Sequence, residues 1–111
     1  MEIAHTAFKH SDLLRVKGRI DSATAPQLAD ALNEITNAGR YRIVLDVSEV
    51  TFISSAGLRV LISTQKTCKR YNRGEIVLAD VPENIMAAFE LAGFTPLFRI
   101  YGETLEAVGS F

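Results

Sequence analysis

After an initial pair of strand-like segments, this sequence alternates between strand-like and helix-like patterns. The expected strands cover residues 2–8, 13–20, 41–47, 75–79 and 97–101. The expected helices cover residues 25–37, 55–71, 82–93 and 103–108. Alternating strands and helices form a largely parallel sheet with right-handed crossovers, whereas the short polar stretch between the first two strands suits a turn. The sequence therefore predicts an α/β fold with a mixed, mostly parallel β-sheet, an N-terminal antiparallel hairpin and about four helices.

Local signals support the ends and faces of these elements. Residues 13–20 alternate between apolar and charged side chains, which is typical of a strand with one wet face at or near the edge of a sheet. Thr24 is a suitable N-cap for the helix that follows, with Pro26 in its first turn. Gly93 followed by Phe94 is typical of a glycine C-cap with a hydrophobic contact. The inner side of the third helix is expected to carry Ile85, Met86, Phe89 and Leu91.

Size and composition predict one folded domain spanning residues 1–111. Hydrophobic residues make up 48% of the chain and charged residues 23%, without low-complexity stretches, which favours a globular protein over a disordered one. The 12 basic and 13 acidic side chains leave a formal net charge of -1, so nucleic acid is not an expected partner. No apolar run approaches the ~20 residues of a membrane span, and we expect a cytoplasmic protein.

The sequence lacks the residue patterns of common catalytic and metal sites. Cys68 is the single cysteine, which excludes an internal disulfide and a cysteine-based metal cluster, and we expect it to be a small core or half-buried helix residue. The only histidines, His5 and His10, lie in or near the first hairpin, away from any serine that a hydrolase would activate. Nucleotide-binding glycine motifs are also absent. We therefore predict no enzymatic activity, no metal and no cofactor for this chain.

Two adjacent hydroxyls stand where the central strand runs into the second helix. Ser55, or Ser54 one residue earlier, is placed to accept a hydrogen bond from a free backbone N–H of the first helical turn, as an ordinary N-cap does. The alternative is a phosphorylation switch, in which a phosphate would disturb an apolar contact made through Ala56, Gly57 and Leu58. In that interpretation Gly57 leaves the start of the helix open to close approach.

The segment from Asp46 to Leu61 resembles a motif of the bacterial anti-sigma factor antagonists, also called STAS domains. The motif runs Asp-x-Ser-x-Val-x-Phe-Ile-Ser-Ser-Ala-Gly-Leu-x-x-Leu in this chain. Residues 18–25 and 89–98 resemble two further segments of the family. Together these segments cover nearly the whole chain, which implies a single STAS domain over residues 1–111.

The resemblance implies a partner-switching mechanism with Ser55 as the phosphorylated residue. Many family members have Asp where this chain has Ser54, and a second Ser where it has Ala56. The unphosphorylated antagonist would bind an anti-sigma factor that is also a serine kinase, and a sigma factor would be released. Phosphorylation would end this association, and a serine phosphatase would restore it, with ATP and magnesium belonging to those enzymes. Asp21 and Thr24 are expected beside the Ser55 turn, as part of the docking face.

A second hypothesis is a STAS module that is never phosphorylated. It would serve as an interaction or scaffold module in a larger assembly, such as a stress-sensing particle or a lipid-transport complex. Ser55 would then be only a helix cap.

Overall fold

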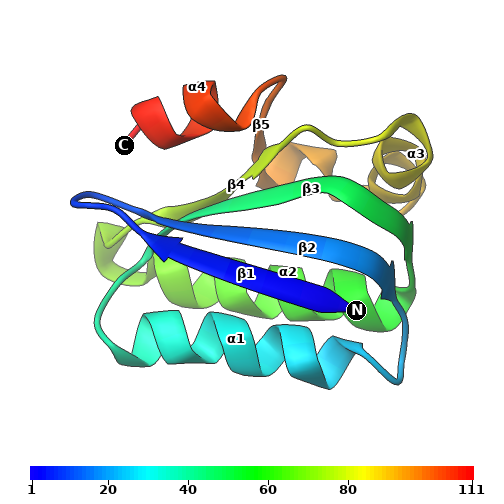
Figure 1. Ribbon diagram of the computed structural model, residues 1–111, viewed down its shortest axis with the longest axis horizontal. Helices are drawn as coiled ribbons and strands as arrows, with labels where there is room; N and C mark the ends of the chain where they lie inside the picture. Colours follow the sequence, from blue (N-terminus) through cyan, green and yellow to red (C-terminus); the bar gives the residue numbers. More distant parts are fainter.

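The computed structural model describes all residues, 1–111, as a five-stranded sheet covered by helices (Figure 1). The strands are β1 (Glu2–Ala7), β2 (Asp12–Ile20), β3 (Arg42–Ile53), β4 (Glu75–Ala79) and β5 (Arg99–Tyr101). The helices are α1 (Ala25–Asn37), α2 (Ser55–Lys69), α3 (Glu83–Leu91) and α4 (Thr104–Gly109), with 3-10 turns η1 (Arg70–Asn72) and η2 (Thr95–Leu97). The strand order is β1-β2-β3-β4-β5, with β1 antiparallel to β2 and all other pairs parallel. The predicted α/β fold, hairpin and helix number are confirmed.

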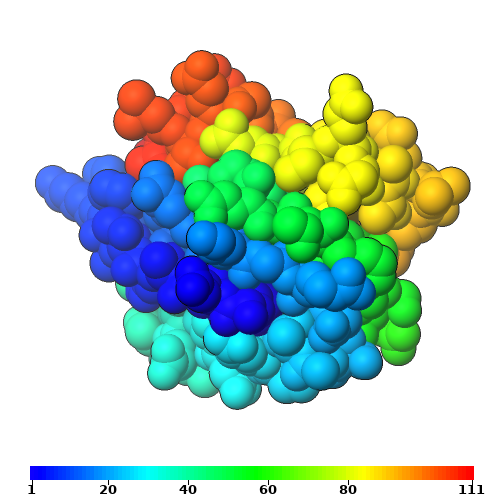
Figure 2. Space-filling model, turned by 45° about the vertical axis from the view of Figure 1, so that its right-hand side comes forward, coloured from blue at the N-terminus to red at the C-terminus, as the bar shows by residue number.

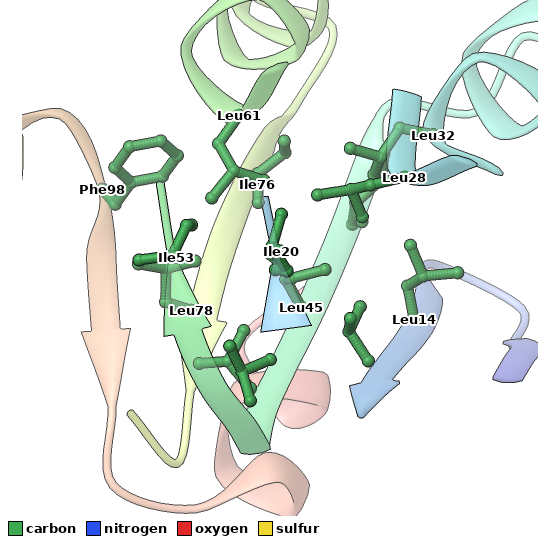
Figure 3. Packing of buried hydrophobic residues seen from close by; sticks show 14 of the residues in the cluster. Leu14, Ile20, Leu28, Leu32, Leu45, Ile53, Leu61, Ile76, Leu78 and Phe98 are labelled. Atoms are coloured by element: carbon green, nitrogen blue, oxygen red, sulfur yellow. The ribbon is translucent and has the colours of Figure 1, made fainter. Parts of the chain in front are cut away.

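Two layers of side chains hold the helices to the sheet. Helices α1 and α2 lie together on one face, and α4 lies on the other (Figure 1). Leu28 and Leu32 of α1 and Leu61 of α2 pack in the same buried cluster as the strand side chains between them (Figure 3). On the opposite face, Ala107 of α4 packs in a smaller buried cluster with residues of β2, β3 and β4. Burial of apolar surface on both faces of the sheet is the main term that stabilises this arrangement.

Strand β3 is longer than the sequence pattern predicts. The expected strand ends at Val47, but β3 continues through Ile53. Beyond Val47 the strand is only partly covered: Ser48 and Glu49, next to a register shift against β2, are both exposed, whereas Val50 and Ile53 remain buried. Parallel pairing with β2 extends this segment, with register shifts. As a consequence, β3 delivers the chain directly into α2 without a loop.

The C-terminal end of α3 follows the prediction, whereas its inner side does so only in part. Gly93 has φ of 72° and the Phe94 N–H donates to the Phe89 carbonyl at 2.9 Å, as expected of a glycine C-cap. Phe89 is buried, but Leu91 is 91% exposed, so its prediction as an inner residue is wrong. The helix ends at Leu91, where no further element covers it.

Cys68 is confirmed as a core residue. Its side chain is fully buried on α2, and burial raises the pKa of the thiol to about 11. The thiol therefore stays protonated and unreactive near neutral pH. As for membranes, none of the helices combines the length and the apolar character that a crossing requires.

Candidate functional site

The candidate site lies where β2 and β3 end side by side. Because the two strands are parallel, the loop of residues 21–24 and the start of α2 emerge at the same edge of the sheet. The Ser54 N–H donates to the Ile20 carbonyl at 2.8 Å, which joins the two segments directly. Figure 2 shows the light-blue segment that contains this loop beside the green segment that contains the start of α2. The sequence expectation that Asp21 and Thr24 lie near the Ser55 turn agrees with this arrangement.

The two serines at this turn have different surroundings. Ser54 is the N-cap: its backbone is extended, and its Oγ accepts a hydrogen bond from the Gly57 N–H at 3.4 Å. Ser55 is the first helical residue, its side chain is exposed, and it makes no cap bond. Of the two caps that the sequence allowed, the structure therefore has Ser54, and Ser55 as a cap is wrong. The Ser55 hydroxyl is left available at the surface.

Arg59, one turn further along α2, contacts Ser55 and was missed by the sequence interpretation. Its Nη2 donates to the Ser55 Oγ at 3.2 Å, and its Nε donates to the Ser55 carbonyl at 3.3 Å. Residues four apart on a helix face each other, so this spacing was the available signal. A guanidinium has donors and no acceptor, so it cannot remove a proton from the serine. It can, however, bind an anion placed on the serine oxygen.

Gly57 and Leu58 are interior residues, which corrects their expected place on an open surface. Leu58 is only 7% exposed. A Cβ added to Gly57 would lie 2.6 Å from Cγ2 of Ile20 and 2.9 Å from Cγ1 of Ile53. The missing side chain thus allows α2 to approach β2 and β3 closely, and does not open the helix start to the outside. Ala56 is half-buried and lies nearer the surface than Gly57.

Asp21 and Thr24 form a hydrogen-bonded loop next to the turn. The Thr24 hydroxyl donates to the Arg19 carbonyl at 2.8 Å and accepts from the Asp21 N–H at 2.9 Å. Thr24 occupies the N-cap position of α1 as predicted, but its side chain makes no cap bond, because it serves the preceding loop. Hydrogen bonds from the backbone N–H of Thr24 and of Ala23 lower the pKa of Asp21. The loop therefore presents a fixed negative charge at neutral pH.

An exposed aromatic ring extends this surface along β3. Phe52 faces outward because Ile53, the next residue of the strand, faces inward. Phe52 is 38% exposed, and the guanidinium carbon of Arg19 lies 4.4 Å from the centre of its ring. The sequence interpretation did not select this pair; the residues come from neighbouring strands, which pair Arg19 with Phe52. The site thus combines an apolar ring, charges of both signs and an exposed hydroxyl.

Comparisons with known proteins place these features in a family context. Residues 4–99 match the family model described as "Mlab, STAS domain". The chain is 33% identical over 96 residues to the proposed anti-sigma factor antagonist BtrV of Bordetella bronchiseptica, covering 86% of this chain and 82% of that protein. It is 29% identical over 100 residues to an anti-sigma-B factor antagonist of Listeria monocytogenes, covering 90% of this chain and 86% of that protein.

A solved structure has the same fold at low sequence identity. The Bacillus cell fate determinant SpoIIAA, in its phosphorylated form, superposes with a TM-score of 0.75 at 14% identity and covers 98% of both chains. At this identity the likeness concerns the fold alone.

Proposed function

This chain belongs to the STAS domain family, and on that premise we propose that it is an anti-sigma factor antagonist that acts by partner switching. In its unphosphorylated form it binds an anti-sigma factor that is also a serine kinase, and a sigma factor is freed. Phosphorylation of Ser55 ends this binding, and a serine phosphatase restores it. The names of the Bordetella and Listeria relatives support this proposal.

The observation that carries the proposal is the exposed hydroxyl of Ser55, which takes no part in capping α2. Because Ser54 already caps α2, a phosphate on Ser55 would not remove a bond that the fold needs. It would add ~1.5 to 2 negative charges at the positive end of the helix, where such charge is favoured. Arg59 could bind the phosphate from one turn away. The domain would stay folded while its surface changed sign.

The docking face of the proposal surrounds this hydroxyl. It comprises Asp21, Thr24, Ser54, Ser55 and Ala56, supported from inside by Gly57 and Leu58, with Phe52 as an exposed apolar contact. A phosphate at its centre would bring charge and bulk into an interface that must exclude water. Such a change weakens binding because the doubly charged phosphate would lose water in the interface while Arg59 supplies only one positive charge in return. This explains how one phosphate group could end the binding of the partner.

The catalytic chemistry in this proposal belongs to the partners. ATP and magnesium are used by the kinase, and this chain is its substrate, without a cofactor or an enzymatic activity of its own. The same scheme implies that the protein works in the cytoplasm, where sigma factors act.

Incubation with the cognate kinase and ATP tests the phosphorylation. One phosphate should be added, and mass spectrometry should locate it at Ser55. Ser55→Ala should abolish labelling. Ser54→Asn is the matched control, because Asn also caps helices well and removes only the neighbouring hydroxyl without adding a charge to the docking face. Labelling of Ser55→Ala, or its loss in Ser54→Asn, would show that the assigned residue is wrong.

Affinity for the kinase tests the switch itself. Ser55→Asp should bind the kinase at least about tenfold more weakly than the unmodified protein, since removing a carboxylate from water in the interface costs more than about 1.4 kcal/mol, which the exposed Arg59 does not offset. Isothermal titration calorimetry measures this directly. Unchanged affinity would argue against charge as the cause of release.

A second candidate is an unphosphorylated STAS module in a larger assembly, such as a stress-sensing or lipid-transport complex. The matching family model, which is named after Mlab and not after an antagonist, favours retaining this candidate. It predicts that kinase and ATP add no phosphate, and that Ser55→Ala leaves partner binding intact.

A further inference from the structure

A shallow groove lies beside the C-terminal half of α2, away from the serines. Its walls come from α2, from the first residue of η1 and from the turn η2, and it has a volume of about 420 Å³. The lining residues are Ile62, Gln65, Lys66, Lys69, Arg70 and Leu97. Ile62, Lys66 and Lys69 follow one another at four and three residues along α2, so they share one face of the helix. Leu97, which is 42% exposed, forms the opposite apolar wall.

Gln65 holds the two walls of this groove together. Its side-chain amide donates to the Ile76 carbonyl at 3.1 Å and to the Leu97 carbonyl at 2.8 Å, and its Oε1 accepts from the Ile76 N–H at 2.6 Å. Gln65 is itself only 5% exposed. A buried side chain with all of these bonds made has little freedom to move. The groove is therefore preformed, which lowers the entropic cost of filling it.

The cations on the rim have no carboxylate partner within the chain; Arg70 has only an aromatic one, its guanidinium carbon lying 5.8 Å from the centre of the Tyr71 ring. Lys66, Lys69 and Arg70 make no salt bridge, whereas Arg15, Lys17, Arg19, Arg40 and Arg99 each pair with a carboxylate. Lys69 also borders a neighbouring hollow lined by Arg42, Arg73 and the Arg99–Glu75 ion pair, so positive charge continues beyond the groove through Arg42 and Arg73. The overall formal charge is only -1, so this end of the molecule differs sharply in charge from the average.

We propose that this groove docks an acidic amphipathic helix of a partner protein. Apolar side chains of such a helix, spaced three and four residues apart, would contact Ile62 and Leu97, as in other helix-in-groove interactions. Glutamate or aspartate on its flanks would pair with the three free cations, which steer association and fix orientation. A concave groove with apolar walls, formed by Ile62 and Leu97, fits a helix better than a flat lipid surface, for which a row of protruding apolar side chains is typical.

This second surface would work independently of the serine switch. Lys66 is eleven residues from Ser55, which corresponds to about 16 Å along a helix. That distance is about two Debye lengths at physiological ionic strength, so the field of a phosphate on Ser55 is largely screened there. The chain would then be able to hold one partner constantly and exchange another, and the inference does not depend on the phosphorylation proposal.

A synthetic peptide probes the groove without knowledge of the natural partner. The probe is a fluorescein-labelled, helix-forming peptide of leucine, alanine and glutamate, with leucines at i, i+4 and i+7. Two matched peptides replace the leucines by serine or the glutamates by lysine. We expect anisotropy to rise only with the first peptide, and amide shifts in ¹⁵N spectra of the full chain to centre on Ile62, Lys66 and Leu97. No binding, or shifts centred on Ser55, would overturn the proposal.

Variants of the chain complete the test. Lys66→Glu should weaken peptide binding about fivefold, because it turns one attraction into a repulsion. Lys9→Glu, an equal charge change at another exposed lysine without a carboxylate partner, should leave the affinity unchanged, as should Ser55→Asp. Equal loss in Lys66→Glu and Lys9→Glu would mean non-specific charge attraction and would overturn the inference. Binding to phosphatidylglycerol vesicles through the same residues, without peptide binding, would replace it with a lipid-binding surface.

Discussion

Both ends of α2 have a residue that bonds to the rest of the fold, followed by a residue that is exposed. At the N-terminal end, Ser54 bonds to the backbone of the fold while Ser55, the next residue, is exposed. Near the C-terminal end, Gln65 bonds to β4 and η2 while the next residue, Lys66, is exposed. Consecutive residues on a helix point in directions about 100° apart, so one can serve the fold and the next can face a partner.

In a small domain, such pairs of inward and outward neighbours indicate where a binding residue can lie. The inward residue of each pair fixes the position of the backbone, and the outward residue then has a defined location without a structural duty. Substitution of the inward residue should therefore act on stability, and substitution of the outward residue on binding. Measurements of stability and of binding at each end of α2 test that division.

The largest effect is expected at Gln65. Gln65→Leu keeps the approximate volume but leaves buried N–H and C=O groups of Ile76 and the carbonyl of Leu97 without partners. Each lost partner costs of order 1 kcal/mol, so the free energy of unfolding should fall by about 3 kcal/mol in urea titrations. Lys66→Ala, its exposed neighbour, should change it by less than about 0.5 kcal/mol. Similar losses in both variants would break the proposed division.

Gly57 should be the next most sensitive position. Its added Cβ in Gly57→Ala would lie within 3 Å of Ile20 and Ile53, and overpacking of this kind costs about 1–3 kcal/mol. Gly109→Ala is the control, because no atom lies within 4 Å of the added Cβ and the helix α4 should gain slightly. The midpoint of thermal unfolding reports both changes. An unaltered midpoint for Gly57→Ala would mean that α2 does not depend on this close approach.

The two serines should separate stability from phosphorylation. Ser54→Ala should lower the free energy of unfolding by about 1 kcal/mol through loss of the cap. Ser55→Ala should change it by less than about 0.5 kcal/mol, since that side chain is exposed. Chemical denaturation of the two variants in parallel distinguishes them. A larger loss at Ser55 would show that the cap is assigned to the wrong residue.

The smallest effect concerns acid titration of the loop beside the serines. Hydrogen bonds from Thr24 and Ala23 lower the pKa of Asp21 below its usual value of 3.8. Because its pKa is lower in the folded protein than in the unfolded chain, the Asp21 carboxylate stabilises the folded loop in full at any pH above its ordinary unfolded-chain pKa. This stabilisation is lost as pH falls through the lower pKa of the folded state.

In ¹⁵N spectra, the amides of Ala23 and Thr24 should therefore shift with a midpoint below that of an ordinary Asp. The groove end, which Gln65 holds without a titrating group, should show no matching transition. A midpoint at or above 3.8 for the loop would contradict the bonded carboxylate.

The sequence predicted the elements well because their signals are local. The alternation of apolar and charged residues in β2, the stop at Gly93 and the burial of Cys68 each depend on nearby residues or on hydropathy alone. The sequence did not predict the end of β3, because two consecutive polar residues such as Ser48 and Glu49 are typical of a loop. The pairing with β2 that keeps them in the strand depends on distant residues. Leu91 was misplaced because helical spacing does not show where the covering partner ends.

The candidate site was found only in part for the same reason. The motif located both hydroxyls but left open which of them caps α2, since each is near a free N–H. The roles of Gly57 and Gln65 depend on Ile20 and Leu97, which are 37 and 32 residues away in the chain.

By itself, the sequence determined the α/β architecture, the family resemblance and the place of a serine pair at a helix start. Tertiary structure alone decided that Ser54 caps α2 while Ser55 is exposed, that Gly57 faces inward, and that Ile62 and Leu97 line one groove. These features arise from contacts between distant segments, and such contacts exist only after the sheet has brought the segments together.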